Sequence, residues 1–133
     1  MRGLRKTLVV AGACALLPTA LAAQAAPASY TAAQAEAGAE AYQAHCAECH
    51  MADLSGSYEA APLTGGYFAS SWGGSPVRQL LQFVRENMPL YRPGSLDEQT
   101  YVALVAYLLQ RSGAPAGETP LAPEAEGVVA PTR

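Results

Sequence analysis

The sequence predicts a single small all-α domain. Apolar residues recur at helical spacing in three stretches, and a serine or threonine suited to an N-cap stands before each stretch. No stretch shows the two-residue alternation typical of β-strands. A length of 133 residues fits one domain, and a helical core of roughly 80 residues would be marginally stable without a further apolar component.

The first 25 residues (1–25) are typical of a secretory signal peptide. A basic start is followed by an apolar run over residues 8–17, which is too short to span a bilayer. Small residues then provide a cleavage site at Ala23-Gln24-Ala25, with residues 20–22 as the alternative. We therefore expect export, a periplasmic mature chain and no transmembrane segment in it. Cys14 lies within the signal, so two cysteines would remain after cleavage.

Cleavage would make the chain strongly acidic. It would leave five basic and eleven acidic residues, a formal net charge of −6, and no lysine, because Lys6 is the only one. Binding to nucleic acid needs a positively charged face, so we expect no nucleic-acid partner. Docking to a partner through a ring of lysines is excluded for the same reason.

The first helix is expected over residues 32–49. Thr31 and Gln34 form a capping-box pattern at its start. One face of this helix carries a glycine, and a glycine inside a helix usually marks the close approach of another helix. The residues spaced for that face are Gly38, Tyr42, Cys46 and Cys49.

A long loop-like stretch over residues 51–74 precedes the second helix. The stretch is rich in turn-forming residues, and a loop of this length in a small domain usually packs on something. The second helix is expected over residues 76–87, with Ser75 as its N-cap and Pro76 at its first position. Pro89 would end it.

The last helix is expected over residues 96–111. Ser95 and Glu98 form a second capping-box pattern at its start, and Gly113 suits its C-terminal end. Residues 114–133 are rich in alanine, proline and glutamate, so we expect them to bury little and to form a flexible tail.

Residues 46–50 read Cys-Ala-Glu-Cys-His, a C-x-x-C-H motif. Cys46 and Cys49 are spaced to form thioether bonds with the two vinyl groups of one haem, which places His50 under the iron as a ligand. A redox dithiol would lie at the start of a helix, whereas these cysteines come at the end of one. A structural zinc site needs four ligands, usually in two pairs, and a disulfide between residues three apart on a helix is strained. The motif therefore predicts one covalent haem c per chain.

A second iron ligand is expected on the opposite haem face. Met1 is removed with the signal, and His45 and Met51 adjoin the attachment motif, so Met88 is the remaining methionine or histidine. Met88 lies where Pro89 stops a helix and frees the methionine to turn inward. Methionine and histidine form an established pair of haem ligands, although a methionine more commonly fills a core.

Other residues could contact the haem propionates. Trp72 could donate a hydrogen bond to a propionate through its indole N–H or serve as core packing, and both interpretations stay open. Arg78, Arg85 and Arg92 could form ion pairs with propionates. The helical spacing of Arg78 and Arg85 favours solvated positions for these two.

By these motifs the chain resembles class I c-type cytochromes over residues 31–113, between the signal and the tail. The family pattern G-x-x-x-[FY]-x-x-x-C-x-x-C-H is matched by Gly38, Tyr42, Cys46, Cys49 and His50. The resemblance implies a small all-α cytochrome c fold, wrapped around one covalent haem, in which the N- and C-terminal helices cross.

The resemblance also implies specific contacts. Tyr107, in the stretch Leu104 to Leu108, would pack on Gly38 and Tyr42 at the helix crossing. The Met-Pro pair implies Met88 as the distal ligand. The segment Pro62 to Gly65 looks like the one in which a proline carbonyl holds the proximal histidine.

The expected function is electron transfer by a single-haem protein, not catalysis, because two axial ligands leave the iron no open site. The run from Met88 to Leu96 resembles cytochromes that accompany bacterial dehydrogenases, particularly quinoprotein ones. The expected redox partners are thus a dehydrogenase as donor and an oxidase or another cytochrome as acceptor. The alternatives are a haem c enzyme or gas or redox sensor with a labile Met88, and a haem-free thiol oxidoreductase.

Overall fold

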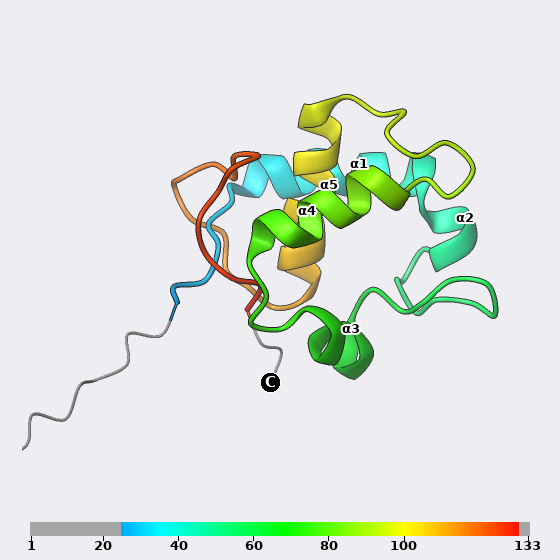
Figure 1. Ribbon diagram of the computed structural model, residues 1–133, viewed down its shortest axis with the longest axis horizontal. Helices are drawn as coiled ribbons and strands as arrows, with labels where there is room; N and C mark the ends of the chain where they lie inside the picture. The colour runs from blue at the N-terminus through cyan, green and yellow to red at the C-terminus, as the bar shows by residue number, and fades with distance from the viewer. Residues whose placement is uncertain (1–24, 131–133) are drawn as a thin grey trace, which may run out of the picture.

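The computed structural model describes residues 25–130, and in that range five α-helices and no β-strand are found (Figure 1). The signal-peptide prediction, with Cys14 and all but the last residue of the segment, lies outside the described residues. None of the described helices is long and apolar enough to cross a membrane.

The first helix starts as predicted but is broken near its end. Helix α1 spans Ala32–His45, and the side chains and backbone of Thr31 and Gln34 form the predicted capping box. The backbone of Cys46 leaves the helical region (φ −127°, ψ −35°), and a four-residue helix α2, Ala47–His50, follows. The prediction of one continuous helix over residues 32–49 is therefore wrong at Cys46.

The stretch expected to be a loop contains a short helix, α3, Gly65–Trp72. Its sequence begins with two glycines, which disfavour a helix, so the helix depends on tertiary packing. Its buried residue is Phe68, which is 1% exposed and belongs to the main hydrophobic core. Packing against the core formed by the other helices thus stabilises the helical structure of this segment.

Helix α4 spans Val77–Asn87 and ends at Met88, as Pro89 predicts. The start differs from the prediction, because Pro76 is the N-cap residue and no side chain caps the helix. The N–H of Val77 instead donates to the carbonyl of Gly127, from the C-terminal segment, at 3.0 Å.

Helix α5 spans Glu98–Arg111, and its N-cap is Asp97. The Asp97 carboxylate accepts hydrogen bonds from the backbone N–H of Thr100 at 3.0 Å and from its hydroxyl at 2.6 Å. These bonds hold the pKa of Asp97 below its usual range. The predicted capping box of Ser95 and Glu98 is wrong, because the neighbouring aspartate caps the helix.

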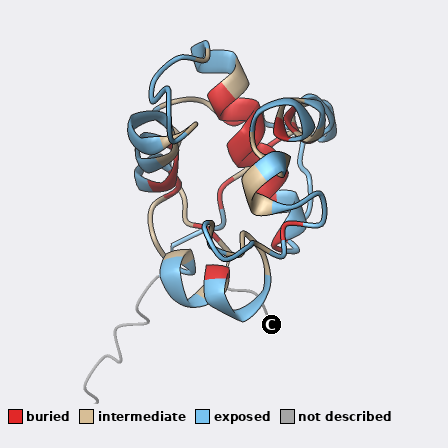
Figure 2. Cartoon of the chain, turned by 90° about the vertical axis from the view of Figure 1, so that its right-hand side faces the viewer, coloured by how far each residue is buried: buried red, intermediate tan, exposed pale blue. Residues whose placement is uncertain are grey.

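The terminal helices α1 and α5 cross in close contact, which confirms the all-α class and the predicted crossing. At Gly38 a β-carbon would overlap the Ala103 carbonyl and would lie 2.8 Å from the β-carbon of Tyr107. The rings of Tyr42 and Tyr107 lie 5.4 Å apart at a tilt of 51°, a favourable aromatic geometry. Buried residues gather on the inward faces of the helices (Figure 2), and α5 is buried continuously from Tyr101 to Leu109.

The C-terminal segment packs on the domain, contrary to the expectation that it would bury little. Leu121 is 4% exposed and Val129 is 1% exposed. Gln34 exchanges two hydrogen bonds with the Leu121 backbone, at 2.9 and 2.8 Å. The buried Tyr30 donates to the carbonyl of Ala114, and Val128 pairs with Ala28.

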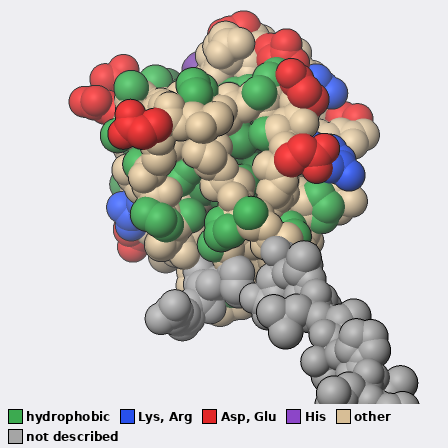
Figure 3. Space-filling model, turned by 90° about the vertical axis from the view of Figure 1, so that its left-hand side faces the viewer, with side chains coloured by type: hydrophobic (Ala, Val, Ile, Leu, Met, Phe, Trp, Pro, Cys, Tyr) green, Lys and Arg blue, Asp and Glu red, His purple; other side chains and the backbone are tan. Residues whose placement is uncertain are grey.

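The composition of the segment after α5 predicted little burial because its packing partners lie far away in the sequence. The N-terminal strip before α1 and the turn between α3 and α4 supply backbone donors and acceptors along it. Figure 3 shows the side of the domain that lies at the left in Figure 1, where acidic side chains outnumber basic ones among the described residues.

We predict that Gly38→Ala destabilises the protein by about 1–3 kcal/mol, because the added methyl group meets rigid backbone of α5. The matched control is Gly66→Ala, where a β-carbon would meet nothing within 4 Å. Its effect should stay within about 1 kcal/mol. Denaturant unfolding of both haem-loaded variants measures the difference, and equal effects would place the helix crossing elsewhere.

We predict that Leu121→Ala destabilises the protein by about 2–5 kcal/mol, because the side chain is buried in the core although it lies in the C-terminal segment. The exposed neighbour Glu124 provides the control, and Glu124→Ala should change the unfolding free energy by less than about 0.5 kcal/mol. A Leu121→Ala variant as stable as the parent would show that the segment is loosely attached in solution.

Candidate functional site

A cavity of about 1270 Å³ lies between the helices and is partly open to solvent. Its wall includes all four residues that the sequence predicts for a site: Cys46, Cys49, His50 and Met88. Met88 is distant from the other three in sequence, and the packing of α4 against α5 brings it to their cavity.

The attachment turn is rigidly supported. Cys46 ends α1, with its N–H donating to the carbonyl of Tyr42 at 2.9 Å, and Cys49 and His50 lie on α2. The backbone N–H groups of Cys49 and His50 both donate to the Cys46 carbonyl, at 3.2 and 3.0 Å. The three side chains thus come from a single short turn, which fixes the spacing between the two sulfurs and the imidazole.

The imidazole of His50 is oriented by a backbone carbonyl. Its Nδ1 lies 2.8 Å from the carbonyl oxygen of Ala61. When Nδ1 carries the proton and donates to this carbonyl, Nε2 is left with a lone pair for a metal. The predicted partner was the carbonyl of Pro62, and the structure places the contact one residue earlier. The hydrogen bond from the Leu63 N–H to the Leu54 carbonyl, at 2.9 Å, fixes the loop so that Ala61, not Pro62, supplies the carbonyl.

Tyr42 supports the same turn from the other side. Its hydroxyl donates to the carbonyl of Met51, the residue after His50, at 2.8 Å. Tyr42 is 1% exposed, and burial raises its pKa well above the usual value, so the hydroxyl stays protonated and remains a donor.

The surroundings of Cys46 do not favour a reactive dithiol. Burial, with a smaller contribution from the neighbouring Cys49 charge, raises the pKa of the Cys46 thiol to about 11. Redox-active dithiols have a lowered thiol pKa, so this environment disfavours thiol exchange. Residues 25–130 also contain no group of three or more His, Cys, Asp or Glu side chains placed to hold a metal ion.

Met88 lies at the end of α4, in the wall of the same cavity. Its N–H donates to the Val84 carbonyl at 2.8 Å, and its own carbonyl accepts from the Tyr101 hydroxyl at 2.8 Å. His45 and Met51 also line the cavity, but both adjoin the attachment turn. The ligation of iron by Met88 therefore stays a prediction, which rests on the distance of Met88 from this turn in the sequence and on its place in the cavity wall.

The cavity wall is mostly apolar. Helices α3, α4 and α5 contribute many of its aliphatic and aromatic side chains, among them Phe68, Leu80, Val84, Leu104 and Leu108. Trp72 also lines it, half-buried, with its ring 5.2 Å from that of Phe83. This position is compatible with both interpretations of Trp72, as a packing residue and as a donor to a propionate.

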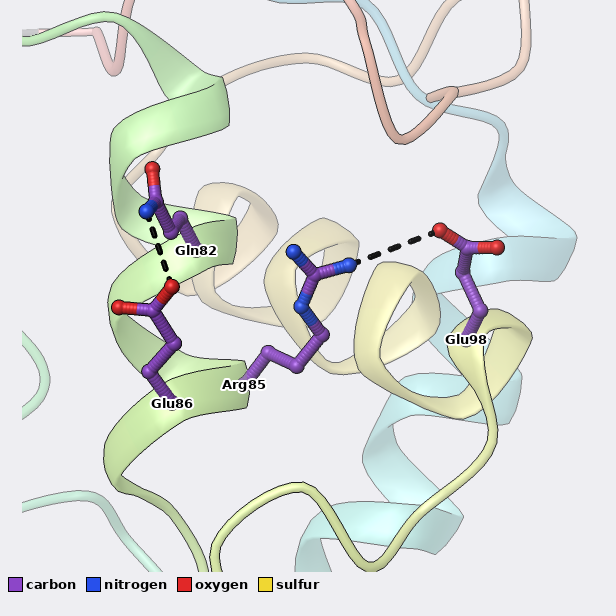
Figure 4. Close-up of polar contacts among 4 residues, drawn as sticks. All are labelled: Gln82, Arg85, Glu86 and Glu98. Atoms are coloured by element: carbon purple, nitrogen blue, oxygen red, sulfur yellow. Dashed lines mark hydrogen bonds and ion pairs between the residues drawn. The ribbon is translucent and has the colours of Figure 1, made fainter.

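The three interior arginines differ in position. Arg92 lies on the cavity wall, where it could reach an anionic group. Arg78 and Arg85 lie outside this cavity, about half-exposed, in ion pairs of 3.8 Å with Glu126 and Glu98. Figure 4 shows Arg85 pointing from α4 toward Glu98 at the start of α5. Both pairs are loose and exposed, so they contribute little to stability.

The residues of the cavity fit a flat, apolar macrocycle with two acidic groups. Two thiols and an imidazole on one turn match covalent attachment and ligation of the iron, and the thioether of Met88 belongs to the same cavity wall. The apolar walls provide the low-dielectric environment that haem requires, and Arg92 supplies a positive charge at the wall.

Sequence reasoning missed two residues that orient the site. Ala61 acts through its backbone, so its side chain gives no signal in the sequence. Tyr101 lies on the buried face of α5, and its hydroxyl donates a hydrogen bond to the carbonyl of Met88. A buried tyrosine usually needs a hydrogen-bond partner, which was the signal available for Tyr101.

We predict that haem stays with the chain after denaturation and acid-acetone extraction, because two thioether bonds hold it. Cys46→Ala or Cys49→Ala should leave at most one such bond and a poorly matured protein. Absorbance of the extracted chain measures the attachment. Extraction of the haem from the unaltered protein would contradict covalent binding through both cysteines.

Residues 33–108 match the protein-family model described as cytochrome C oxidase, cbb3-type, subunit III. The match includes the attachment turn, Met88 and most of α5, and it covers more than half of the chain. No curated protein and no solved structure matches the chain.

Proposed function

The chain belongs to this family of c-type cytochrome domains, which transfer electrons through haem, and on that premise we propose that it is an exported carrier of single electrons. The observation that carries the proposal is the placement of Cys46, Cys49, His50 and Met88 on one largely apolar cavity. When bound there, haem c would supply one-electron oxidation and reduction at its iron.

His50 and Met88 would be the two protein ligands of the haem iron. Two protein ligands leave no position for a substrate, which favours electron transfer over catalysis. The chain holds the donors in place through the backbone: the Ala61 carbonyl orients His50, and the Tyr101 hydroxyl holds Met88. A fixed ligand geometry in both oxidation states reduces the rearrangement that electron transfer requires.

A periplasmic location is part of the proposal. It is supported by the signal-like segment over residues 1–25 and by the C-x-x-C-H motif, because covalent attachment of haem needs reduced thiols after export. The mature chain would carry no lysine and a net charge of −6, from five basic and eleven acidic residues.

Redox partners would dock over the cavity mouth through apolar contacts. Among the described residues, every large hydrophobic side chain that is exposed also belongs to the cavity lining. These residues are Met51, Tyr58, Tyr67, Phe83, Leu90 and Tyr91. We propose a dehydrogenase as donor, from the resemblance of the Met88 to Leu96 run, and an oxidase as acceptor, which the description of the matched family supports.

The rival functions depend on Met88 and on the cysteines. A haem enzyme or a gas or redox sensor needs Met88 to leave the iron, and Met88 is followed by an exposed loop. A haem-free thiol oxidoreductase is disfavoured by the raised pKa of Cys46. The visible spectrum separates the three, because low-spin haem indicates the carrier, high-spin haem the enzyme or sensor, and no colour the thiol protein.

We predict that Met88→Ala opens the distal position of the iron. Water or hydroxide favours the ferric state more than a thioether does, so the reduction potential should fall and carbon monoxide and imidazole should bind. Spectroelectrochemistry and ligand titration of the haem-loaded protein measure these changes.

Met51→Leu is the matched control, since Met51 also reaches the cavity but adjoins His50. It should keep the low-spin spectrum and the potential of the parent. A Met88→Ala variant with the parent's spectrum and potential would contradict the assignment of Met88, and a Met51→Leu variant that loses them would move the assignment to Met51.

A further inference from the structure

The loop that follows Met88 has few contacts of its own with the rest of the domain. Residues 90–95 are all exposed. Within the loop, the N–H of Arg92 donates to the Pro89 carbonyl at 2.8 Å, and the N–H of Ser95 donates to the Arg92 carbonyl at 3.2 Å. These bonds shape the loop, but they do not fix it to a helix.

The hydroxyl of Tyr101 joins both ends of this loop to α5. It donates to the Met88 carbonyl at 2.8 Å and accepts from the Leu96 N–H at 3.4 Å. Tyr101 is 1% exposed and lies in the first turn of α5, the helix that crosses α1 at Gly38. One buried hydroxyl therefore ties the exposed loop to the rigid part of the domain.

Tyr101 is not among the residues that line the cavity. Its ring is buried in the core, and its hydroxyl reaches the backbone of Met88, not the cavity itself. Any effect of Tyr101 on the iron must therefore pass through the position of Met88.

The proximal side of the site has a similar arrangement. Tyr42, on α1, donates through its hydroxyl to the carbonyl of Met51 at 2.8 Å, directly after His50. The two crossing helices thus each provide a buried tyrosine, and each tyrosine holds the backbone at or next to a predicted iron ligand.

We propose that Tyr101 is a positioning residue that keeps Met88 on the iron and so keeps the distal position closed to other ligands. This inference rests on the proposed function, because it requires that Met88 is an iron ligand. The hydrogen bonds of the Tyr101 hydroxyl stabilise the state in which Met88 is bound to the iron. A foreign ligand can bind only in the state in which Met88 has left the iron.

The test is an imidazole titration of the ferric haem-loaded protein, in which imidazole nitrogen replaces the sulfur of Met88. Tyr101→Phe removes the hydroxyl and keeps the ring in the core. We expect it to tighten imidazole binding about 3- to 10-fold, the change expected when one hydrogen bond stabilising the closed state is lost. An unchanged imidazole affinity would overturn the proposal.

Tyr30→Phe is the matched control. Tyr30 is 0% exposed and also donates to a backbone carbonyl, that of Ala114, in the C-terminal segment. We expect both this variant and Tyr101→Phe to lower the denaturant midpoint, but only Tyr101→Phe to change imidazole affinity. Equal tightening in both variants would indicate general loosening of the fold and would also overturn the proposal.

A double-mutant cycle with Met88→Ala separates this inference from the proposed function. If Tyr101 acts through Met88, Tyr101→Phe should not change imidazole affinity once Met88 is absent. A further tightening in that background would contradict a role through Met88. If Met88→Ala alone left the spectrum and the imidazole affinity unchanged, the proposed function would fail first, and the role of Tyr101 would fail with it.

Discussion

No side chain separates α1 from α5 where they cross, because even a β-carbon at Gly38 would overlap the Ala103 carbonyl. Both sides of the cavity depend on this contact. Tyr42 and Tyr101, one on each helix, bond the backbone carbonyls of Met51 and Met88. The geometry of the cavity therefore depends on a helix contact that lies outside it. A change at the crossing would alter the positions of both predicted ligands.

The sequence predicted the features that depend on local spacing. The cap at Thr31, the end of α4 at Met88 and the crossing at Gly38 each follow from residues close together in the chain or from a family pattern. The attachment motif also reaches the predicted cavity. The sequence could not show the backbone partner of His50. The Ala61 carbonyl accepts this hydrogen bond because of how the loop is folded, and the Ala61 side chain plays no part in it.

Features that depend on distant partners were predicted less well. Helix α3 was not predicted, because two glycines at its start are typical of a loop. It forms because Phe68 can enter a core supplied by other helices. The segment after α5 has a composition typical of disorder, yet Leu121 and Val129 are buried, since the strip before α1 and the turn before α4 provide its hydrogen-bond partners. Composition describes a segment alone, whereas burial depends on what the fold places beside it.

One haem bound in this cavity would be held at its iron by the imidazole nitrogen of His50 and the thioether of Met88. The most direct measurement is the near-infrared and electron paramagnetic resonance spectrum of the oxidised protein, isolated from the exported fraction. We predict low-spin ferric haem with the weak charge-transfer band typical of a thioether bound to ferric iron. A high-spin spectrum, or a low-spin spectrum with two nitrogen ligands, would contradict it.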